Sequence, residues 1–399
     1  MHGGTMTETY LKTHPWITFQ LDGRKIPYSV WMDLGAIQSK VEHVAHTMLP
    51  PEAAKRLAML YLSKGVHGTT AIEGNTLSEE QVRDYVQGRV SLPPSQEYQG
   101  LEINNIVLAC KEIAEAVLGG LGAELTAARV CRYNKMVLEG LPRDEEVVPG
   151  QMRKHTVVVR GVGYRGVPPT QCKQLVERMC DWINREIRPQ TAHQEIAFAV
   201  LRAVLAHLYL AWIHPFADGN GRTARLIEFQ VLLAAGFPSI TAHLLSNHYN
   251  LTRSEYYRHL AQASKSGGDV VPFIRYAIEG LRDGLDAQIK EIRHTQWDLA
   301  WKDYVYDKFR ERKGEAAHRQ RQLILELADN GPTPISRLTE LSPRIARLYA
   351  NKTRKTLTRD VNFLVQEGLA MKTAKGVESN HQALLSLLPP RRLKESVEE

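Results

Sequence analysis

The stretch from His214 to Arg225 constrains this chain more than any other part of its sequence. It reads HPFADGNGRTAR and directly follows the apolar run from Ile196 to Ile213, which is typical of a buried helix that ends in a polar loop. The Gly-Asn-Gly turn then opens a second helix, expected from Arg222 to Ala235. Two helices joined by a short loop therefore bring a base, a carboxylate and two arginines together.

Each polar group of this loop suits a particular chemical task. The imidazole of His214 titrates near neutral pH and can accept a proton from a hydroxyl nucleophile. The carboxylate of Asp218 suits a hard cation such as Mg²⁺, or it simply caps the following helix. Backbone N–H groups of Gly219-Asn220-Gly221 at a helix N-terminus form a site for an anion such as phosphate.

Two arginines follow on the same helix. Arg222 and Arg225 are three residues apart and share a face near the helix N-terminus. Cations there oppose the helix dipole, a cost that makes sense if an anion binds between them. Because a guanidinium can bind phosphate with two parallel hydrogen bonds, the loop is predicted to hold a polyphosphate on a metal.

Nine positions of this stretch match the signature HPFxDGNGRxxR, and the chain resembles the Fic family of protein adenylyltransferases. The resemblance implies transfer of AMP from ATP, with Mg²⁺ or Mn²⁺, to a Ser, Thr or Tyr hydroxyl of a target protein and of the enzyme itself. It assigns the general base to His214 and the metal to Asp218. It assigns phosphate binding to five other residues of the stretch: Gly219, Asn220, Gly221, Arg222 and Arg225.

Two further regions resemble features of that family. The Gly150–Arg153 segment, the valine-rich strand expected from Thr156 to Arg160 and Pro168-Pro169 look like its flap, a hairpin that positions the target by strand addition. Tyr256 and Tyr257 resemble residues that line the adenine pocket, although they suit a packing role as well. Ser264 stands where many relatives carry an Asn that reads adenine, so another nucleotide or a phosphocholine donor stays open.

The segment TTAIEGN, from Thr69 to Asn75, resembles the family's inhibitory motif, [S/T]xxxE[G/N]. Thr69 and Glu73 are four residues apart and share one face of a helix. Alone, the segment is an ordinary helix end with Gly74 as its C-cap. With the resemblance, Glu73 is expected to pair with Arg225 and misplace the phosphates of ATP. The same Glu could instead orient a water that removes AMP, and the sequence does not decide between the two directions.

The last ninety residues have a different character. From Arg310 to Glu399 there are 17 Lys and Arg against 11 Asp and Glu, so six of the seven net positive charges lie there. Helices are expected at 319–328, 334–341 and 353–368, followed by a strand pair, which resembles a winged helix-turn-helix. The third helix has an apolar face and an opposite basic one. Four residues on the basic face are candidate DNA contacts: Lys352, Arg354, Lys355 and Arg359.

Protein binding by this module is the alternative to DNA binding. A rival reading of the whole chain is a DNA-binding transcriptional regulator whose Fic core senses nucleotide. The expected fold is mainly α, with a helical Fic core, a short β-hairpin flap and a C-terminal winged helix. Four parts are expected: an inhibitory N-terminal helical region (1–125), the Fic core (126–295), a helical connector (296–318) and the winged helix (319–388).

The apolar run before His214 also needs comparison with a membrane helix. Arg202 and His207 interrupt it, which favours a buried core helix over a membrane span. The N-terminus lacks an apolar signal core, and the four cysteines form no CxxC pair. A cytoplasmic protein with reduced thiols is therefore expected, with no membrane partner. Whether it forms a homodimer is left open.

Overall fold

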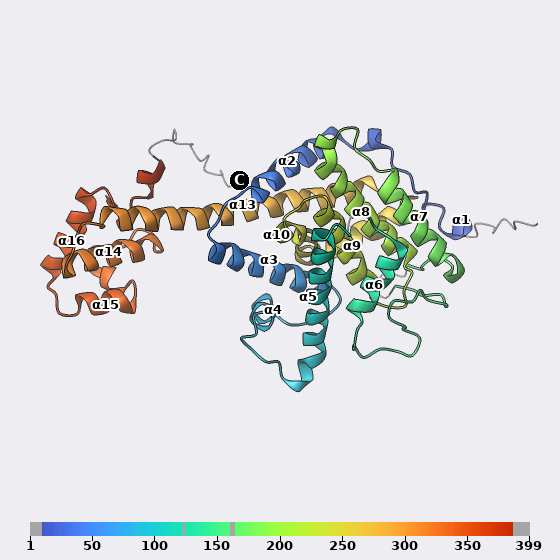
Figure 1. Ribbon diagram of the computed structural model, residues 1–399, viewed down its shortest axis with the longest axis horizontal. Coiled ribbons are helices and arrows are strands. Elements are labelled where there is room, and N and C mark those ends of the chain that lie inside the picture. Colours follow the sequence, from blue (N-terminus) through green and yellow to red (C-terminus); the bar gives the residue numbers. More distant parts are fainter. Residues whose placement is uncertain (1–9, 122–123, 160–163, 386–399) are drawn as a thin grey trace, which may run out of the picture. The chain divides into compact units, whose positions relative to one another are not determined.

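The computed structural model describes residues 10–121, 124–159 and 164–385. These residues are mainly helical, and their only regular strands are one C-terminal pair, which confirms the expected fold class (Figure 1). The end of the expected flap strand at Arg160 and the last residues of the expected C-terminal module, 386–388, lie outside these ranges. The chain divides into two compact units, Met1–Lys290 and Glu291–Glu399.

The first unit holds the N-terminal helices and the HPFADGNGRTAR loop together, and the unit boundary falls within α13. Its helices are α1 (Tyr10–Thr13), α2 (Tyr28–Ala45), α3 (Pro51–Ile72), α4 (Glu79–Val86), α5 (Glu97–Leu118), α6 (Ala127–Val137), α7 (Cys172–Arg185), α8 (Glu195–Ile213), α9 (Asn220–Ala234), α10 (Ser239–Ala242), α11 (Leu244–Leu251), α12 (Arg253–Lys265) and α13 (Val271–Lys308). Short 3₁₀ turns lie at Gly23–Lys25, Pro94–Gln96, Pro169–Gln171 and Ala192–Gln194.

Helix α8 is the centre of this unit. Nearly all of its side chains are buried, and it packs against α7 and α9. The segment Ala192–Ile213 is long and apolar enough to cross a membrane, but 78% of that window is buried inside the protein. Burial on all sides removes apolar side chains from water as a membrane would, so this helix has the pattern of a core helix.

Helix α3 runs from Pro51 to Ile72, so Thr69 lies in its last turn. Two glycines lie in its second half. A Cβ at Gly65 would collide with the ring of His243, and one at Gly68 with the backbone of Ser246. Close packing against α10 and α11, two helices that the sequence did not predict, therefore offsets the low helix propensity of glycine.

The regular strand that was expected in the flap is not formed. Residues 156–159 form no strand, and the described residues make a single antiparallel bridge between Val158 and Arg165. Two backbone hydrogen bonds support it, Val159 N–H to Tyr164 O (2.7 Å) and Gly166 N–H to Val157 O (3.2 Å). Gly166 lies next to this bridge, and a glycine weakens an extended strand.

The second unit has the expected number of helices but not all in the expected places. It contains α14 (Glu315–Ala328), the 3₁₀ turn η5 (Ile335–Glu340), α15 (Pro343–Tyr349), α16 (Arg354–Gln366), β1 (Ala370–Thr373), β2 (Gly376–Ser379) and η6 (His381–Leu385). The short helix predicted at 334–341 is a 3₁₀ helix, and a further α-helix that was not predicted begins at Pro343. Ser342 caps it by accepting a hydrogen bond from Ile345 N–H (3.3 Å).

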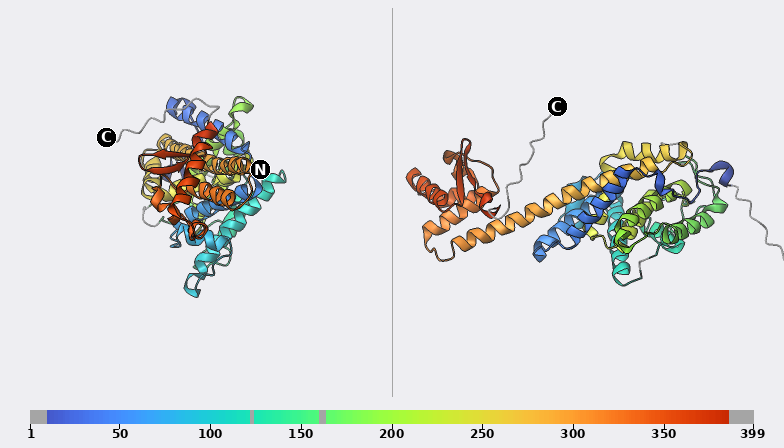
Figure 2. Two further views of the ribbon diagram at one scale, coloured as in Figure 1. Left: turned by 90° about the vertical axis from the view of Figure 1, so that its left-hand side faces the viewer. Right: turned by 90° about the horizontal axis from the view of Figure 1, so that it is seen from above.

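Strands β1 and β2 form an antiparallel hairpin after α16 (Figure 2). An isolated bridge between Thr333 and Val377 ties the segment before η5 to β2. Apolar side chains of all three helices and the hairpin close one core, which includes Leu323, Ile345 and Val361.

Candidate active site

His214 lies at the C-terminal end of α8 in a left-handed backbone conformation, with φ 49° and ψ 58°. Such a conformation is uncommon for a residue with a Cβ and is found mostly at special positions. The ring Nδ1 faces the carbonyl of Ala211 at 3.4 Å, so in the tautomer that donates this bond Nε2 is free to accept a proton. Burial lowers the pKa of His214 to about 4, which keeps the imidazole neutral at physiological pH.

The loop after His214 is held by its own side chains. The side-chain amide of Asn220 closes the loop, because it accepts a hydrogen bond from Phe216 N–H (3.0 Å) and donates one to Phe216 O (2.9 Å). Gly219 has φ 78° and donates its N–H to Asp218 Oδ1 at 2.6 Å. The predicted phosphate residue Asn220 therefore shapes the loop with its side chain. Its backbone, with that of Gly221, begins α9, where N–H groups of the first turn have no acceptor within the helix.

Arg225 is 2% exposed and meets both predicted inhibitory residues. Its Nε donates to Thr69 Oγ1 (2.6 Å), and its Nη2 donates to Thr69 O (3.0 Å) and to Glu73 Oε1 (2.5 Å). Burial by itself would raise the pKa of the Glu73 carboxyl, but the guanidinium groups of Arg225 and Arg222 hold it below its usual value. The side chain of Glu73 keeps 29% of its surface exposed, so this pair is reachable from solvent on one side.

Glu73 also lies over the start of α9. A Cβ at Gly221 would collide with Glu73 Oε1, so the carboxylate occupies space that only a glycine leaves free. This is the position where a helix N-terminus attracts an anion. The end of α3 and the start of α9 thus bring together Thr69, Glu73, Gly221 and Arg225, of which the sequence predicted the pair Glu73–Arg225.

Arg222 lies on the same side of α9 and is 5% exposed. Its Nη1 donates to Glu102 Oε1 (3.1 Å), and its Nη2 lies 3.5 Å from Asp218 Oδ2. Its Nε, like Nη1 of Arg225, is a buried donor without a hydrogen-bond partner among the described residues. Because buried donors are rarely left unsatisfied, the two orphan N–H groups are candidate partners for a further acceptor, such as an anionic ligand.

Comparisons with known proteins agree with this geometry. Residues 124–232 match the family model described as the Fic/DOC family. The chain contains a Fic domain. Over 221 residues it is 30% identical to the protein adenylyltransferase Fic of Drosophila ananassae, covering 55% of this chain and 40% of the fly protein. Over 240 residues it is 29% identical to the protein adenylyltransferase fic-1 of Caenorhabditis briggsae, covering 60% of this chain and 43% of the worm protein.

This chain therefore spans less than half the length of the curated relatives that it matches. Solved structures share its fold. A Fic family protein from Desulfovibrio desulfuricans has a TM-score of 0.53 at 19% identity, covering 86% of this chain and 91% of that one. Fic-1 from C. elegans (residues 134–508) has a TM-score of 0.53 at 24% identity, covering 67% of this chain and 74% of that one.

Two residues of the candidate site were not predicted from the sequence. Asn134 on α6 is fully buried, and it donates to Asp218 O (2.9 Å) and accepts from Gly150 N–H (2.9 Å). Glu102 on α5 pairs with Arg222 through Oε1 and accepts from Asn75 Nδ2 through Oε2 (2.9 Å). A polar residue on an apolar helix face was the only local signal for either, because their partners are far away in sequence.

The two tyrosines predicted at the adenine pocket differ in position. Tyr256 is buried, stacks on Tyr249 and bonds His207 Nε2 through its hydroxyl (2.8 Å). Tyr257 is half-buried, and its hydroxyl lies 3.4 Å from Ile72 O, next to Glu73. Tyr257 is therefore the one that keeps surface near the site, and the adenine contact stays a prediction.

The donor set suits a metal that is shared with a ligand. Asp218 has 53% of its side chain exposed, and the described residues contain no group of three or more His, Cys, Asp or Glu that could hold a metal. Mg²⁺ commonly binds one or two carboxylates and completes its shell with substrate phosphates and water. The residues present fit such an ion with Asp218 as the protein ligand.

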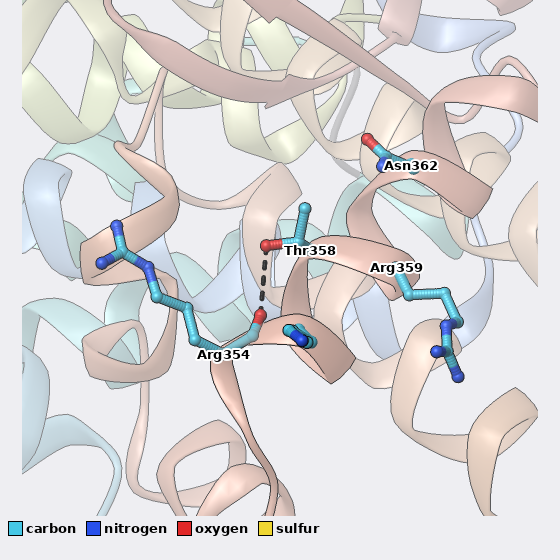
Figure 3. A pocket seen from close by; sticks show the side chains of 5 residues that line it. Arg354, Thr358, Arg359 and Asn362 are labelled. Atoms are coloured by element: carbon cyan, nitrogen blue, oxygen red, sulfur yellow. Dashed lines mark hydrogen bonds between the residues drawn. The ribbon is translucent and has the colours of Figure 1, made fainter.

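The predicted basic face lies in the second unit, around α16. Arg354, Lys355 and Arg359 are exposed, and among the described residues none of the three has a carboxylate partner. With Thr358 and Asn362 they line a shallow hollow of about 510 Å³, in which Arg354 and Arg359 extend to opposite sides (Figure 3). The fourth predicted contact, Lys352, lies before α16 and is 3.7 Å from Glu315.

Proposed function

We propose that this protein is an autoinhibited protein adenylyltransferase that transfers AMP from ATP to a Ser, Thr or Tyr hydroxyl of a target protein, and to itself. The observation that carries the proposal is the contact of Arg225 with Glu73 above the first turn of α9. A carboxylate there occupies the place of an anion, and orphan donors of Arg222 and Arg225 remain beside it. The curated relatives' name, protein adenylyltransferase, supports the same activity.

The chain's residues divide the reaction between them. Nε2 of His214 takes the proton from the target hydroxyl, whose oxygen bonds the α-phosphorus while the bond to the β-phosphate oxygen breaks. Pyrophosphate leaves, and its charge is stabilised by Arg222, Arg225 and the N–H groups that begin α9. When bound, Mg²⁺ neutralises phosphate charge and helps the leaving group. Asp218 would hold that ion.

Inhibition follows from competition for one guanidinium. As long as Glu73 accepts from Arg225 Nη2, the terminal phosphates cannot take the same donor and the same space above Gly221. ATP then binds with its phosphates displaced from the line of attack. Removing the carboxylate frees Arg225 for the substrate, because the second anchor, Thr69, is not charged.

The test compares wild type, Glu73→Gly, His214→Ala and the double variant Glu73→Gly/His214→Ala in α-labelled ATP with Mg²⁺, measuring label on protein. We expect strong labelling of the Glu73 variant, little in wild type and none in the double variant Glu73→Gly/His214→Ala. Thr69→Val, which removes a hydroxyl but not a charge, is the matched control and is expected to activate much less. Equal labelling of wild type and Glu73→Gly would contradict autoinhibition.

Absence of label in every variant would contradict AMP transfer from ATP. The same proteins are then incubated with labelled GTP, CTP and a phosphocholine donor, and with a previously adenylylated target. Label from another donor, or release of AMP that depends on Glu73, would identify one of the alternative reactions left open by the sequence.

We further propose that the second unit is a winged helix-turn-helix that binds duplex DNA through α16. The unpaired cations Arg354, Lys355 and Arg359 favour this over protein binding, because a patch of uncompensated positive charge attracts a polyanion. The triple variant to Ala is expected to reduce the salt dependence of binding to a 30-base-pair duplex by a slope of about 3. Arg337→Ala, an exposed arginine paired with Glu340, is the control.

Unchanged DNA binding in the triple variant, or none by the wild type at low salt, would contradict the DNA proposal and leave a protein partner. Strong operator binding without AMP transfer by any variant would instead favour the nucleotide-sensing regulator. We also propose a cytoplasmic location, in keeping with the four free cysteines (Cys110, Cys131, Cys172 and Cys180).

A further inference from the structure

The C-terminal end of α8 has an unusual set of partners. The last carbonyl groups of an α-helix have no N–H donor within the helix and need donors from elsewhere. Here His214 N–H bonds Leu210 O (2.8 Å), the His214 ring faces Ala211 O, and the hydroxyl of Tyr164 donates to Trp212 O (2.8 Å). The carbonyls of Ile213, His214 and Pro215 are left for a single residue.

That residue is Arg153, which is 4% exposed. Its backbone N–H donates to Pro215 O (2.9 Å), its Nε to His214 O (2.7 Å), and its Nη2 lies 3.5 Å from Ile213 O. The cation also lies at the negative end of the α8 dipole, where a positive charge is favourable. Arg153 thus satisfies the backbone on both sides of the left-handed residue that carries the base.

The same guanidinium reaches the two arms of the expected flap. Nη1 donates to His155 O (2.8 Å), and Nη2 donates to Val167 O (2.5 Å). Gly166 packs so closely that a Cβ there would meet Arg153 Nη2 and lie 3.1 Å from His214 Cβ. Within the described residues the flap arms and the base therefore share one anchor.

We propose that Arg153 is a positioning residue that holds the general base and the flap in one fixed register. A target segment that pairs with the flap would then present its hydroxyl at a constant distance from Nε2 of His214. The phosphate turn has additional supports in the side chains of Asn134 and Asn220, so we expect ATP binding to depend less on Arg153 than the transfer step does. This inference rests on the proposed AMP transfer and adds the residue that aligns its acceptor side.

The test introduces Arg153→Met and Arg153→Lys into the Glu73→Gly protein. Because displacement of reacting groups by about 1 Å can cost about 100-fold in rate, we expect Arg153→Met to lower kcat for transfer by roughly that factor. The Kd of a non-hydrolysable ATP analogue should change less than about threefold, and Arg153→Lys should recover part of kcat. The matched control is Asn184→Ala, which removes two hydrogen bonds to Leu125 far from the flap.

A purely structural role for Arg153 predicts a different pattern. In that case Arg153→Met would lower the Tm and would reduce kcat and ATP binding equally, as general destabilisation does. This result, or an unchanged kcat, would overturn the proposal. A readout independent of AMP transfer is the ¹³Cα chemical shift of His214, which reports its backbone conformation. We expect it to change in Arg153→Met and not in Asn184→Ala. If the parent protein transfers no AMP, the proposed function fails, and an unchanged shift alone would overturn the role of Arg153.

Discussion

The arginines at the candidate active site of the first unit differ from those on α16 of the second unit in burial and pairing. In the first, Arg222 and Arg225 are buried, paired with carboxylates and still left with orphan N–H donors. In the second, Arg354 and Arg359 are exposed and unpaired. A third kind is Arg319, whose Nε donates to the buried carboxylate of Asp360 at 2.7 Å.

These differences in burial and pairing distinguish a ligand-binding site, an exposed binding surface and a structural ion pair. A buried arginine that has N–H groups without partners can exchange one anion for another, since phosphate can replace the carboxylate paired with it. Exposed arginines act at a distance and depend on salt concentration. A fully satisfied pair, such as Arg319–Asp360, mainly shapes the fold around it, because removing one partner leaves a buried charge.

The largest effect that would test this distinction is on stability. Asp360 also accepts from Gln320 Nε2 (2.8 Å) and from the hydroxyl of Tyr349 (3.0 Å). Asp360→Ala is therefore expected to destabilise the second unit by about 3–5 kcal/mol, as measured by hydrogen exchange of α16 amides in the full chain. Glu340→Ala, at an exposed pair of the same unit, should cost less than about 0.5 kcal/mol.

A loss below about 1 kcal/mol in Asp360→Ala would mean that the bridge is no different from a surface pair. Hydrogen exchange of amides in the first unit should show that Glu73→Ala destabilises that unit less than Asp360→Ala destabilises the second. The reason is that the Glu73 side chain is partly exposed, whereas Asp360 is 2% exposed.

The second effect is on catalysis. In the Glu73→Gly protein, Arg225→Ala is expected to lower AMP transfer by about 100-fold or more, because a preorganised donor to the leaving group is lost. Arg225→Lys should restore only a part, since an ammonium cannot form the paired hydrogen bonds of a guanidinium. Initial rates of labelling measure both.

The control is Arg275→Ala, an exposed arginine on α13 of the same unit, which should leave the rate unchanged. If Arg225→Ala kept the rate of its parent, the buried arginine would be a structural bridge like Arg319, and its comparison with the exposed arginines of α16 would lose its meaning.

The smallest effect concerns pH. The pKa of Glu73 is lowered in the folded protein, so its pair with Arg225 adds stability at pH values above the usual Glu pKa of about 4.3. That contribution is lost only as pH falls through the lower, folded-state pKa. The difference in unfolding free energy between wild type and Glu73→Gln should thus be constant from pH 7 to about 5 and shrink below about 4.

Mild acid is accordingly not expected to activate the wild-type protein. A stability difference that already declined between pH 7 and 6 would show that Glu73 titrates like a neutralised, buried acid. In that case Arg225 would not be held by charge.

Some of this site was readable because the information is local. His214, Asp218 and Arg225 are within twelve residues, and helix periodicity alone places the two arginines on one face. Thr69 and Glu73 were also found by their four-residue spacing. The left-handed backbone of His214 was not readable, because a His-Pro pair after an apolar helix is compatible with several loop conformations.

Other contacts depend on segments that are distant in sequence. Glu102 meets Arg222 across 120 residues, and Asn134 meets Asp218 across 84. Helix α15 was missed, although its first residue, Pro343, is of a type that suits the first turn of a helix. The flap strand was overestimated because three valines favour an extended conformation, whereas the described residues pair through a single bridge, Val158–Arg165.

By itself, the sequence determined the chemical groups of this protein: the base, the carboxylate, the glycine turn, the arginines and the candidate inhibitory Glu73. It did so because spacing on one helix or in one tight loop leaves little freedom. Only the tertiary structure decided which charges are paired, since burial and partner choice depend on how α3, α5 and α9 pack. The same packing made Arg153 the shared anchor of the flap and the base, because its N–H groups meet five backbone carbonyls, those of His155, Val167, Ile213, His214 and Pro215.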